Sequence, residues 1–126
     1  MEFPDFEYII TKEKYQQFIA VSDDTHQLHV NSEYAISKGF NDVVVHGNIL
    51  NCILSNLIGM KLNLEHVMIV NQTINYRRPI YINDVLSVKL NLKEEIRFLP
   101  GLDIQFRFFR RDELIANGTI LIKTEL

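Results

Sequence analysis

The amino-acid sequence predicts an α+β fold, in which an antiparallel sheet wraps a long central helix. Apolar side chains cover most of the surface of the helical segment 48–60, and such a helix needs burial on most sides. The segments that follow it carry apolar residues in a strand-like pattern, separated by turn signals, as successive antiparallel strands do. The chain has 126 residues, 47% of them hydrophobic, which suits one core. We therefore expect residues 1–126 to form a single domain.

The first predicted element is a short amphipathic helix over residues 12–21. Tyr15, Phe18 and Ile19 recur there at helical spacing, and Thr11 stands before them as a possible N-cap. The pattern predicts a helix with one apolar face.

A loop and a second short helix follow. Residues 22–28 have no apolar period and are rich in loop-forming residues. Residues 31–38 resemble a short helix, capped by Asn31 or Ser32 and ended by Gly39. The run of polar residues between the helices is thus expected to be irregular.

The central helix is preceded by a β-branched run, residues 43–45, that lies directly against His46 and Gly47. We interpret this run as a lead-in to the helix rather than a long strand. After the helix, four strands are predicted at residues 68–76, 85–92, 102–109 and 114–123, with turns at 83–84, 100–101 and 111–112. Asn117-Gly118 has hairpin chemistry, but only a short stretch follows it, so we expect a bulge or a close backbone approach within the last strand.

The charge of the chain argues against a nucleic-acid partner. The formal net charge is −3 at pH 7, whereas nucleic-acid binders usually carry a strongly basic face. Arg107, Arg110 and Arg111 cluster, but Asp112 and Glu113 lie beside them. We expect a solvated strand end and turn there rather than an anion site.

Secretion and membrane insertion are not predicted either. Residues 1–5 lack the basic and apolar regions of a signal peptide, and the central helix is too short and too interrupted by polar residues to span a bilayer. The one cysteine, Cys52, excludes an internal disulfide and has apolar neighbours, so we expect a small core residue. These features favour a cytoplasmic protein.

The residues that point to chemistry lie in the loop and at the start of the central helix. Asp24 and His29 stand five positions apart, and His46-Gly47 comes directly before the helix. A carboxylate and an imidazole are the parts of a proton-transfer site, and a helix N-terminus favours negative charge. Taken alone, however, such a pair is more often a loop cap and a surface histidine, and such a glycine is ordinary turn punctuation.

The order and spacing of these residues resemble the MaoC-like (R)-specific enoyl-CoA hydratase and acyl dehydratase family. The family signature is Ser-Gly-Asp-x-Asn-Pro-Leu-His followed by His-Gly, and the matching residues are Ser22, Asp24, Leu28, His29, His46 and Gly47. Asp23, His26 and Gln27 replace the usual Gly, Asn and Pro. Residues 76–86 resemble a second family pattern, Phe-x-x-Pro-Val-x-x-Gly-Asp-x-Leu, with Asn83 for Gly, so the similarity covers residues 18–122.

The resemblance implies a hotdog fold, a homodimer, and hydration or dehydration across the 2,3 bond of an acyl thioester of CoA or acyl carrier protein. It assigns Asp24 and His29 to the catalytic water. The backbone N–H of Gly47 would serve the oxygen that gains charge, with Asn48 as a second donor or a cap. We also place Ser22 and His26 among the substrate-binding candidates. His46 is expected to be structural.

Two alternatives stay open at this point: a hotdog thioesterase and a non-catalytic acyl-thioester-binding homologue. The altered loop at His26 and Gln27 favours the non-catalytic homologue. A changed loop can move a catalytic group, and a displacement of one ångström costs on the order of a hundredfold in rate. The histidines and Asp24 fit no zinc motif. We therefore predict neither a metal nor another cofactor.

Overall fold

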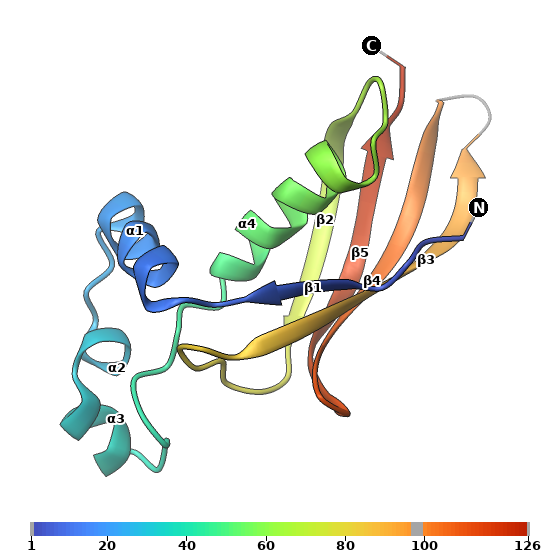
Figure 1. The fold of residues 1–126 in the computed structure, drawn as a ribbon. Coiled ribbons are helices and arrows are strands. Elements are labelled where there is room, and N and C mark those ends of the chain that lie inside the picture. The colour runs from blue at the N-terminus through green and yellow to red at the C-terminus, as the bar shows by residue number, and fades with distance from the viewer. Residues whose placement is uncertain (1, 97–99, 126) are drawn as a thin grey trace.

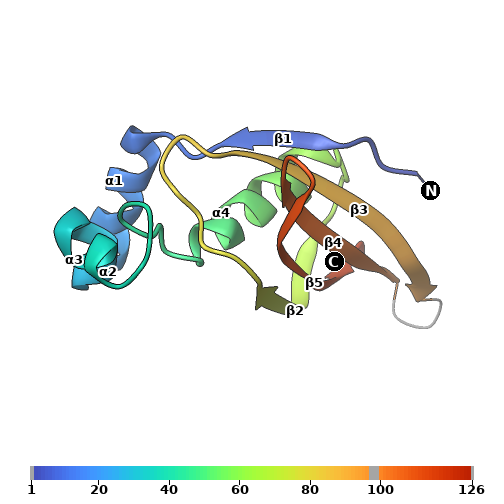
Figure 2. The ribbon, with the colours of Figure 1, turned by 90° about the horizontal axis from the view of Figure 1, so that it is seen from below.

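A five-stranded antiparallel sheet curves around one helix, α4 (Figures 1 and 2). This computed structural model describes residues 2–96 and 100–125. The strand order is β1-β3-β4-β5-β2, and the bounds are β1 Phe6–Ile9, β2 Met68–Tyr76, β3 Val85–Ile96, β4 Gly101–Arg110 and β5 Glu113–Lys123. The arrangement confirms the predicted α+β hotdog fold.

The four strands after the central helix lie where the sequence predicts them, with β3 longer by four residues, because its pairing with β4 continues from Leu92 to Ile96. The strand β1 was not predicted. It has four residues and pairs antiparallel with β3, from Phe6 opposite Val88 to Ile9 opposite Val85. A segment this short gives too few positions to establish an alternating pattern.

Gly118 lies within β5 and confirms the predicted close backbone approach. It pairs with Phe106 of β4 on one side and Ile74 of β2 on the other. A Cβ atom at this position would collide with the backbone carbonyl of Thr73 and lie 2.7 Å from the Phe106 ring. Only glycine lets the three strands meet here.

The helix α4, Ile49–Asn56, continues as a π-helical turn, Leu57–Lys61. Together they cover the predicted segment. The buried residues face the sheet, and they are Ile49, Leu50, Ile53, Leu54, Leu57 and Ile58. Cys52 is exposed, so its expected core position is wrong. The sheet covers one side of α4, and the thiol lies on another.

The helices α1, α2 and α3 form a layer to one side of the sheet (Figure 1). They span Lys12–Ser22, Gln27–Val30 and Ser32–Ser37. Thr11 caps α1 as predicted, since its hydroxyl accepts the Lys14 N–H at 3.2 Å. The Asn31 side chain caps α3 by accepting the Tyr34 N–H at 3.0 Å.

Arg110 corrects the expectation of a solvated cluster. Its guanidinium lies 2.7 Å from an Asp84 oxygen and 2.9 Å from a Glu113 oxygen, and it donates to the Pro79 carbonyl at 3.0 Å. It therefore ties the β4–β5 turn to the segment between β2 and β3. Arg111 has a φ of 56° and is exposed in the turn, as expected for a solvated turn residue.

Among residues 2–96 and 100–125, no helix has the length and apolar character needed to cross a membrane. The cytoplasmic location stays a prediction.

Candidate active site

The loop after α1 is built by three side chains that each accept the N–H two residues further on. The Ser22 hydroxyl accepts from Asp24 at 3.3 Å, the Asp24 carboxylate from His26 at 3.2 Å, and the His26 ring from Leu28 at 3.2 Å. Such side-chain-to-backbone bonds are what Ser and Asp form in turns. The last of them caps α2, a short helix whose first two residues were expected to lie in an irregular loop.

The cap that His26 provides explains one departure from the family signature. Its ring nitrogen accepts a backbone N–H, as an asparagine oxygen would in the same place. Ser22 and His26, both expected near substrate, lie in these turns, and neither lines the cavity described below. Their role as substrate contacts stays a prediction.

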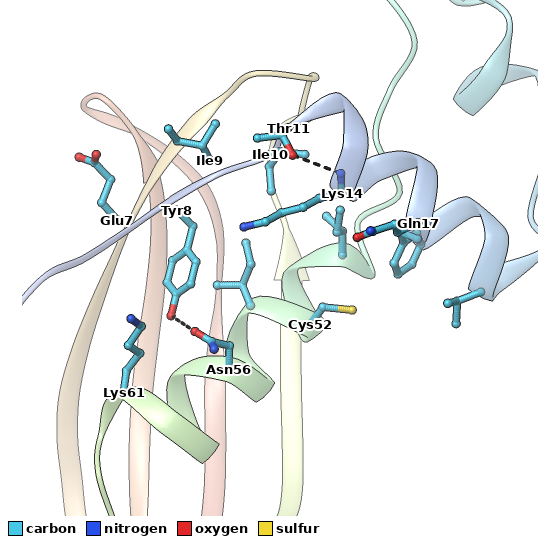
Figure 3. Close-up of a pocket in the computed structure, with 14 residues that line it drawn as sticks. Glu7, Tyr8, Ile9, Ile10, Thr11, Lys14, Gln17, Cys52, Asn56 and Lys61 are labelled. Atoms are coloured by element: carbon cyan, nitrogen blue, oxygen red, sulfur yellow. Dashed lines mark hydrogen bonds between the residues drawn. The ribbon is translucent and has the colours of Figure 1, made fainter.

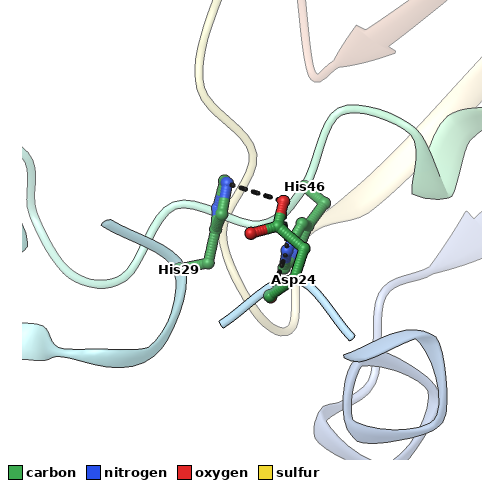
Figure 4. Close-up of side chains that lie close together, drawn as sticks. All are labelled: Asp24, His29 and His46. Atoms are coloured by element: carbon green, nitrogen blue, oxygen red, sulfur yellow. Dashed lines mark hydrogen bonds and ion pairs between the residues drawn. The ribbon is translucent and has the colours of Figure 1, made fainter. Parts of the chain in front are cut away.

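Asp24 and His29 come together at the end of this loop (Figure 4). The Nε2 of His29 lies 3.9 Å from the Asp24 Oδ2, with the side chains 19% and 48% exposed. The separation exceeds a direct hydrogen bond and suits one water that bonds to both groups. The sequence-predicted pair is therefore assembled.

The contact of the other ring nitrogen of His29 shows where the ring carries a hydrogen. Nδ1 lies 2.5 Å from the Val44 carbonyl oxygen, and because a carbonyl only accepts, Nδ1 carries the hydrogen. In the neutral ring the Nε2 lone pair then faces Asp24. A neutral imidazole in this tautomer can take a proton from a water.

The carboxylate of Asp24 is held in its charged form. The backbone N–H of His26 is the main cause that lowers the pKa of this carboxyl, and His46 and His29 add to the effect. Asp24 is therefore ionised at neutral pH. An ionised carboxylate beside a free imidazole lone pair provides two proton acceptors around one water.

His46, which was expected to be structural, is part of the same cluster. It is 4% exposed and stacks on the His29 ring at a centroid distance of 3.7 Å. Its Nε2 lies 2.8 Å from the Asp24 backbone oxygen and 3.3 Å from Asp24 Oδ2. Both are acceptors, so Nε2 carries a hydrogen that fastens Asp24.

Burial lowers the pKa of His46, which keeps the ring neutral at pH 7. The Tyr15 hydroxyl lies 3.0 Å from the His29 carbonyl oxygen and 3.0 Å from the His46 Nδ1, so its one hydrogen is shared between these two acceptors. Burial also raises the pKa of Tyr15 to about 12, so this hydroxyl stays a donor. The polar contacts of Tyr15 were not predicted, because the helical pattern counts this residue as an apolar position of α1.

The lead-in segment 43–46 joins the loop to α4. The Val44 N–H donates to the Leu28 carbonyl at 2.9 Å, and the Val45 N–H donates to the Ile80 carbonyl at 2.8 Å. With the bonds of Val44 to His29 and of His46 to Asp24, three consecutive residues, 44–46, hold the loop that carries Asp24 and His29.

Gly47 and Asn48 lie at the N-terminal end of α4 and line a cavity of about 420 Å³ together with His29. The first N–H groups of a helix lack intrahelical acceptors, so an anion is favoured there. Asn48 makes no side-chain cap; its Oδ1 accepts from Asn51 at 3.0 Å and from the Tyr76 hydroxyl at 3.4 Å. A Cβ on Gly47 would lie 2.7 Å from the Tyr76 ring. Tyr76 therefore covers the glycine, which the sequence did not reveal.

The same side chains are also the kinds that bind metals. Donor atoms of Asp24, His29 and His46 all lie within 4.8 Å of one another. The His46 ring, however, is engaged on both nitrogens, with Asp24 and with Tyr15. The arrangement fits a metal poorly, and the expected absence of a metal stays a prediction.

Comparisons with known proteins agree with this picture. A family model described as MaoC like domain matches residues 3–99. The 3-hydroxybutyryl-CoA dehydratase of Methylorubrum extorquens is 24% identical over 106 residues, 84% of this chain and 68% of that protein. The (R)-specific enoyl-CoA hydratase of Aeromonas caviae is 23% identical over 107 residues, 84% of this chain and 80% of that protein. The solved structure of the (R)-hydratase from A. caviae involved in PHA biosynthesis superimposes with a TM-score of 0.87 at 20% identity, covering 97% of this chain and 93% of that one.

Proposed function

Because the chain belongs to the MaoC-like domain family, we propose that it adds water to, or removes it from, the 2,3 bond of an acyl thioester. Relatives named as a 3-hydroxybutyryl-CoA dehydratase and an (R)-specific enoyl-CoA hydratase support this reaction class. The observation that carries the proposal is the charged Asp24 carboxylate facing the His29 Nε2 across 3.9 Å, beside a cavity at a helix N-terminus.

In the proposed hydration, Asp24 and His29 hold one water between them. The water oxygen bonds to the β-carbon, one of its protons passes to this pair, and the α-carbon receives a proton from the pair. Water thus adds across the double bond, and dehydration reverses each step. No cofactor is needed for this balance.

Gly47 is the proposed donor to the thioester oxygen, which gains negative charge as water adds. Its N–H precedes α4, where the helix dipole favours an anion. A fixed donor at this point stabilises the transition state more than the substrate. Asn48, next to it, is the proposed second donor.

A pair of assays tests the proposed reaction against its alternatives. Purified protein is incubated with crotonyl-CoA and with acetyl-CoA, and the conjugated-enoyl absorbance and free thiol are followed. Loss of absorbance without thiol release is expected. Thiol release would instead indicate a thioesterase, and neither signal together with measurable crotonyl-CoA binding would indicate a non-catalytic binder.

We also propose that the chain forms a homodimer through β2. This strand lies at the edge of the sheet and exposes Met68, Ile69 and Val70 by 54%, 41% and 51%. An exposed apolar edge strand is a template for pairing with a second copy. Light scattering at micromolar concentration should give the dimer mass, and Val70→Lys should reduce it to the monomer. Val21→Lys, which changes an 85% exposed residue on α1, is the matched control.

A further inference from the structure

A second and larger cavity lies between α4, α1 and β1 (Figure 3). Its volume is about 890 Å³, within the range of roughly 300–1,000 Å³ of small-molecule sites. It shares no lining residue with the cavity beside His29. The two cavities are therefore separate, and the proposed hydratase chemistry does not use this one.

The walls of the second cavity are mostly apolar. They include Phe18, Ile49 and Ile53, and at the rim Val21, which is 85% exposed. Apolar side chains left open to water at the mouth of a cavity favour an apolar ligand. A hydrocarbon chain is the simplest group that fits such walls.

Two lysines from different elements give the cavity a positive charge. Figure 3 shows Lys14, from α1, and Lys61, from the π-helical turn, on two sides of Tyr8. None of the ion pairs formed among residues 2–96 and 100–125 involves either lysine. The acidic lining residue Glu7 precedes Tyr8 in β1, so its side chain points to the opposite face of the strand.

The polar groups between the lysines are neutral. The Tyr8 hydroxyl donates to the Asn56 oxygen at 3.0 Å, which leaves the Asn56 amide N–H groups directed away from that bond. Burial raises the pKa of Tyr8, so the phenol stays uncharged at neutral pH. The head-group end of the cavity thus combines two cations with amide donors.

We propose that this cavity binds a medium-chain fatty acid, with the hydrocarbon chain along α1 and α4 and the carboxylate between Lys14 and Lys61. The ammonium groups attract the negative carboxylate and can donate a hydrogen bond to each of its two oxygens. The apolar walls match the chain. This binding site is independent of the proposed reaction.

Cys52 allows a direct test, because it is the one cysteine of the chain, is exposed and lines this cavity. Alkylation of the thiol by N-ethylmaleimide is followed by intact mass, with and without laurate below its micellar concentration. Laurate should slow alkylation at least threefold. Acetate, which lacks the chain, should leave the rate unchanged, and dodecanol, which lacks the charge, should protect at concentrations at least fivefold higher.

The lysine variants identify the head-group site. Lys14→Met and Lys61→Met should each weaken laurate protection about threefold to tenfold, whereas Lys38→Met, which removes an exposed charge at the C-terminal end of α3 and does not line the cavity, should not. The alkylation rate of each variant without ligand corrects for changes in thiol reactivity. Titration calorimetry of Cys52→Ser with laurate provides a readout that does not depend on the thiol.

Three results would overturn the proposal. One is the absence of laurate binding in both measurements, and another is equal protection by laurate and dodecanol. The third is protection by crotonyl-CoA, which would make the cavity part of the thioester site. Because the hydratase assay does not involve Lys14 or Lys61, failure here leaves the proposed function untouched.

Discussion

The half of the molecule formed by the sheet and α4 is held by apolar packing, whereas the half formed by α1, α2 and α3 has few buried apolar side chains and positions its loop with polar contacts. Among the residues that the structure describes, the buried apolar side chains that precede His46 are only Ile10, Tyr15, Ala35 and Val45. In the first half, geometry depends on many small contacts. In the second, a few hydrogen bonds position the candidate catalytic groups, so substitutions there should change activity more than stability.

The largest expected effect is on turnover, at the polar half. Asp24→Asn or His29→Ala should lower turnover of crotonyl-CoA by about 10²- to 10⁴-fold, because each removes one of two groups acting on one water. The double variant should be little worse than either single variant. Steady-state kinetics measures the loss, and thermal unfolding should show melting temperatures near that of the unchanged protein. Wild-type rates in either variant would remove these residues from the mechanism.

The second prediction concerns the packed half, where a core substitution should lower the free energy of unfolding by about as much as the first substitutions raise the activation free energy. Leu54 is fully buried in α4, so Leu54→Ala should lower the free energy of unfolding by about 2–5 kcal/mol. Turnover per folded molecule should stay within a few fold. Urea denaturation measures the stability, with Met60→Ala as the control, since Met60 is 71% exposed. A large loss of turnover in folded Leu54→Ala protein would break the division between the halves.

The third prediction tests the junction of the halves, at Gly47. Gly47→Val should lower turnover on the order of a hundredfold, because the added side chain pushes the Tyr76 ring and blocks access to the N–H. Tyr76→Phe, which keeps the ring and removes the contact with Asn48, should stay within a few fold. A fully active Gly47→Val would leave Gly47 as a packing residue.

The fourth prediction concerns Tyr15 and His46. Tyr15→Phe leaves the buried His46 Nδ1 without its donor and should cost about 1–3 kcal/mol of unfolding free energy. Because the pKa of His46 is lowered in the folded state, the unfolded chain binds a proton at a higher pH than the folded chain does. Stability should therefore be complete above the ordinary histidine pKa and decline as pH falls toward the lowered one. Denaturation at several pH values should show a flatter profile for His46→Gln.

The smallest expected effect is at His26. His26→Asn keeps an acceptor for the Leu28 N–H, so activity and stability should change little. His26→Ala removes it and should cost about 0.5–2 kcal/mol, with a larger loss of turnover than in His26→Asn. Equal behaviour of the two variants in kinetics and denaturation would show that the ring does not hold the loop.

The packed half was also the more predictable one. Alternation over residues 68–76 is a local pattern, and β2 occupies those residues. The predicted core position of Cys52 was wrong, because the apolar pattern of a helix does not show how many of its sides the sheet covers. The contacts of Tyr15 with His46 join residues 31 positions apart, which no local period records. Asp24 and His29 were predictable as a pair because the family signature keeps them five residues apart.

The backbone bond from the Val44 N–H to the Leu28 carbonyl has a consequence for the evolution of the chain. It closes a loop that contains α3, and both ends of this loop are fastened beside the His29 ring. Residues can be inserted at the exposed tip, near Gly39 and Asn41, while the fastened ends keep their spacing. New length, such as a lid, can therefore be acquired in this loop without displacing the His29 ring.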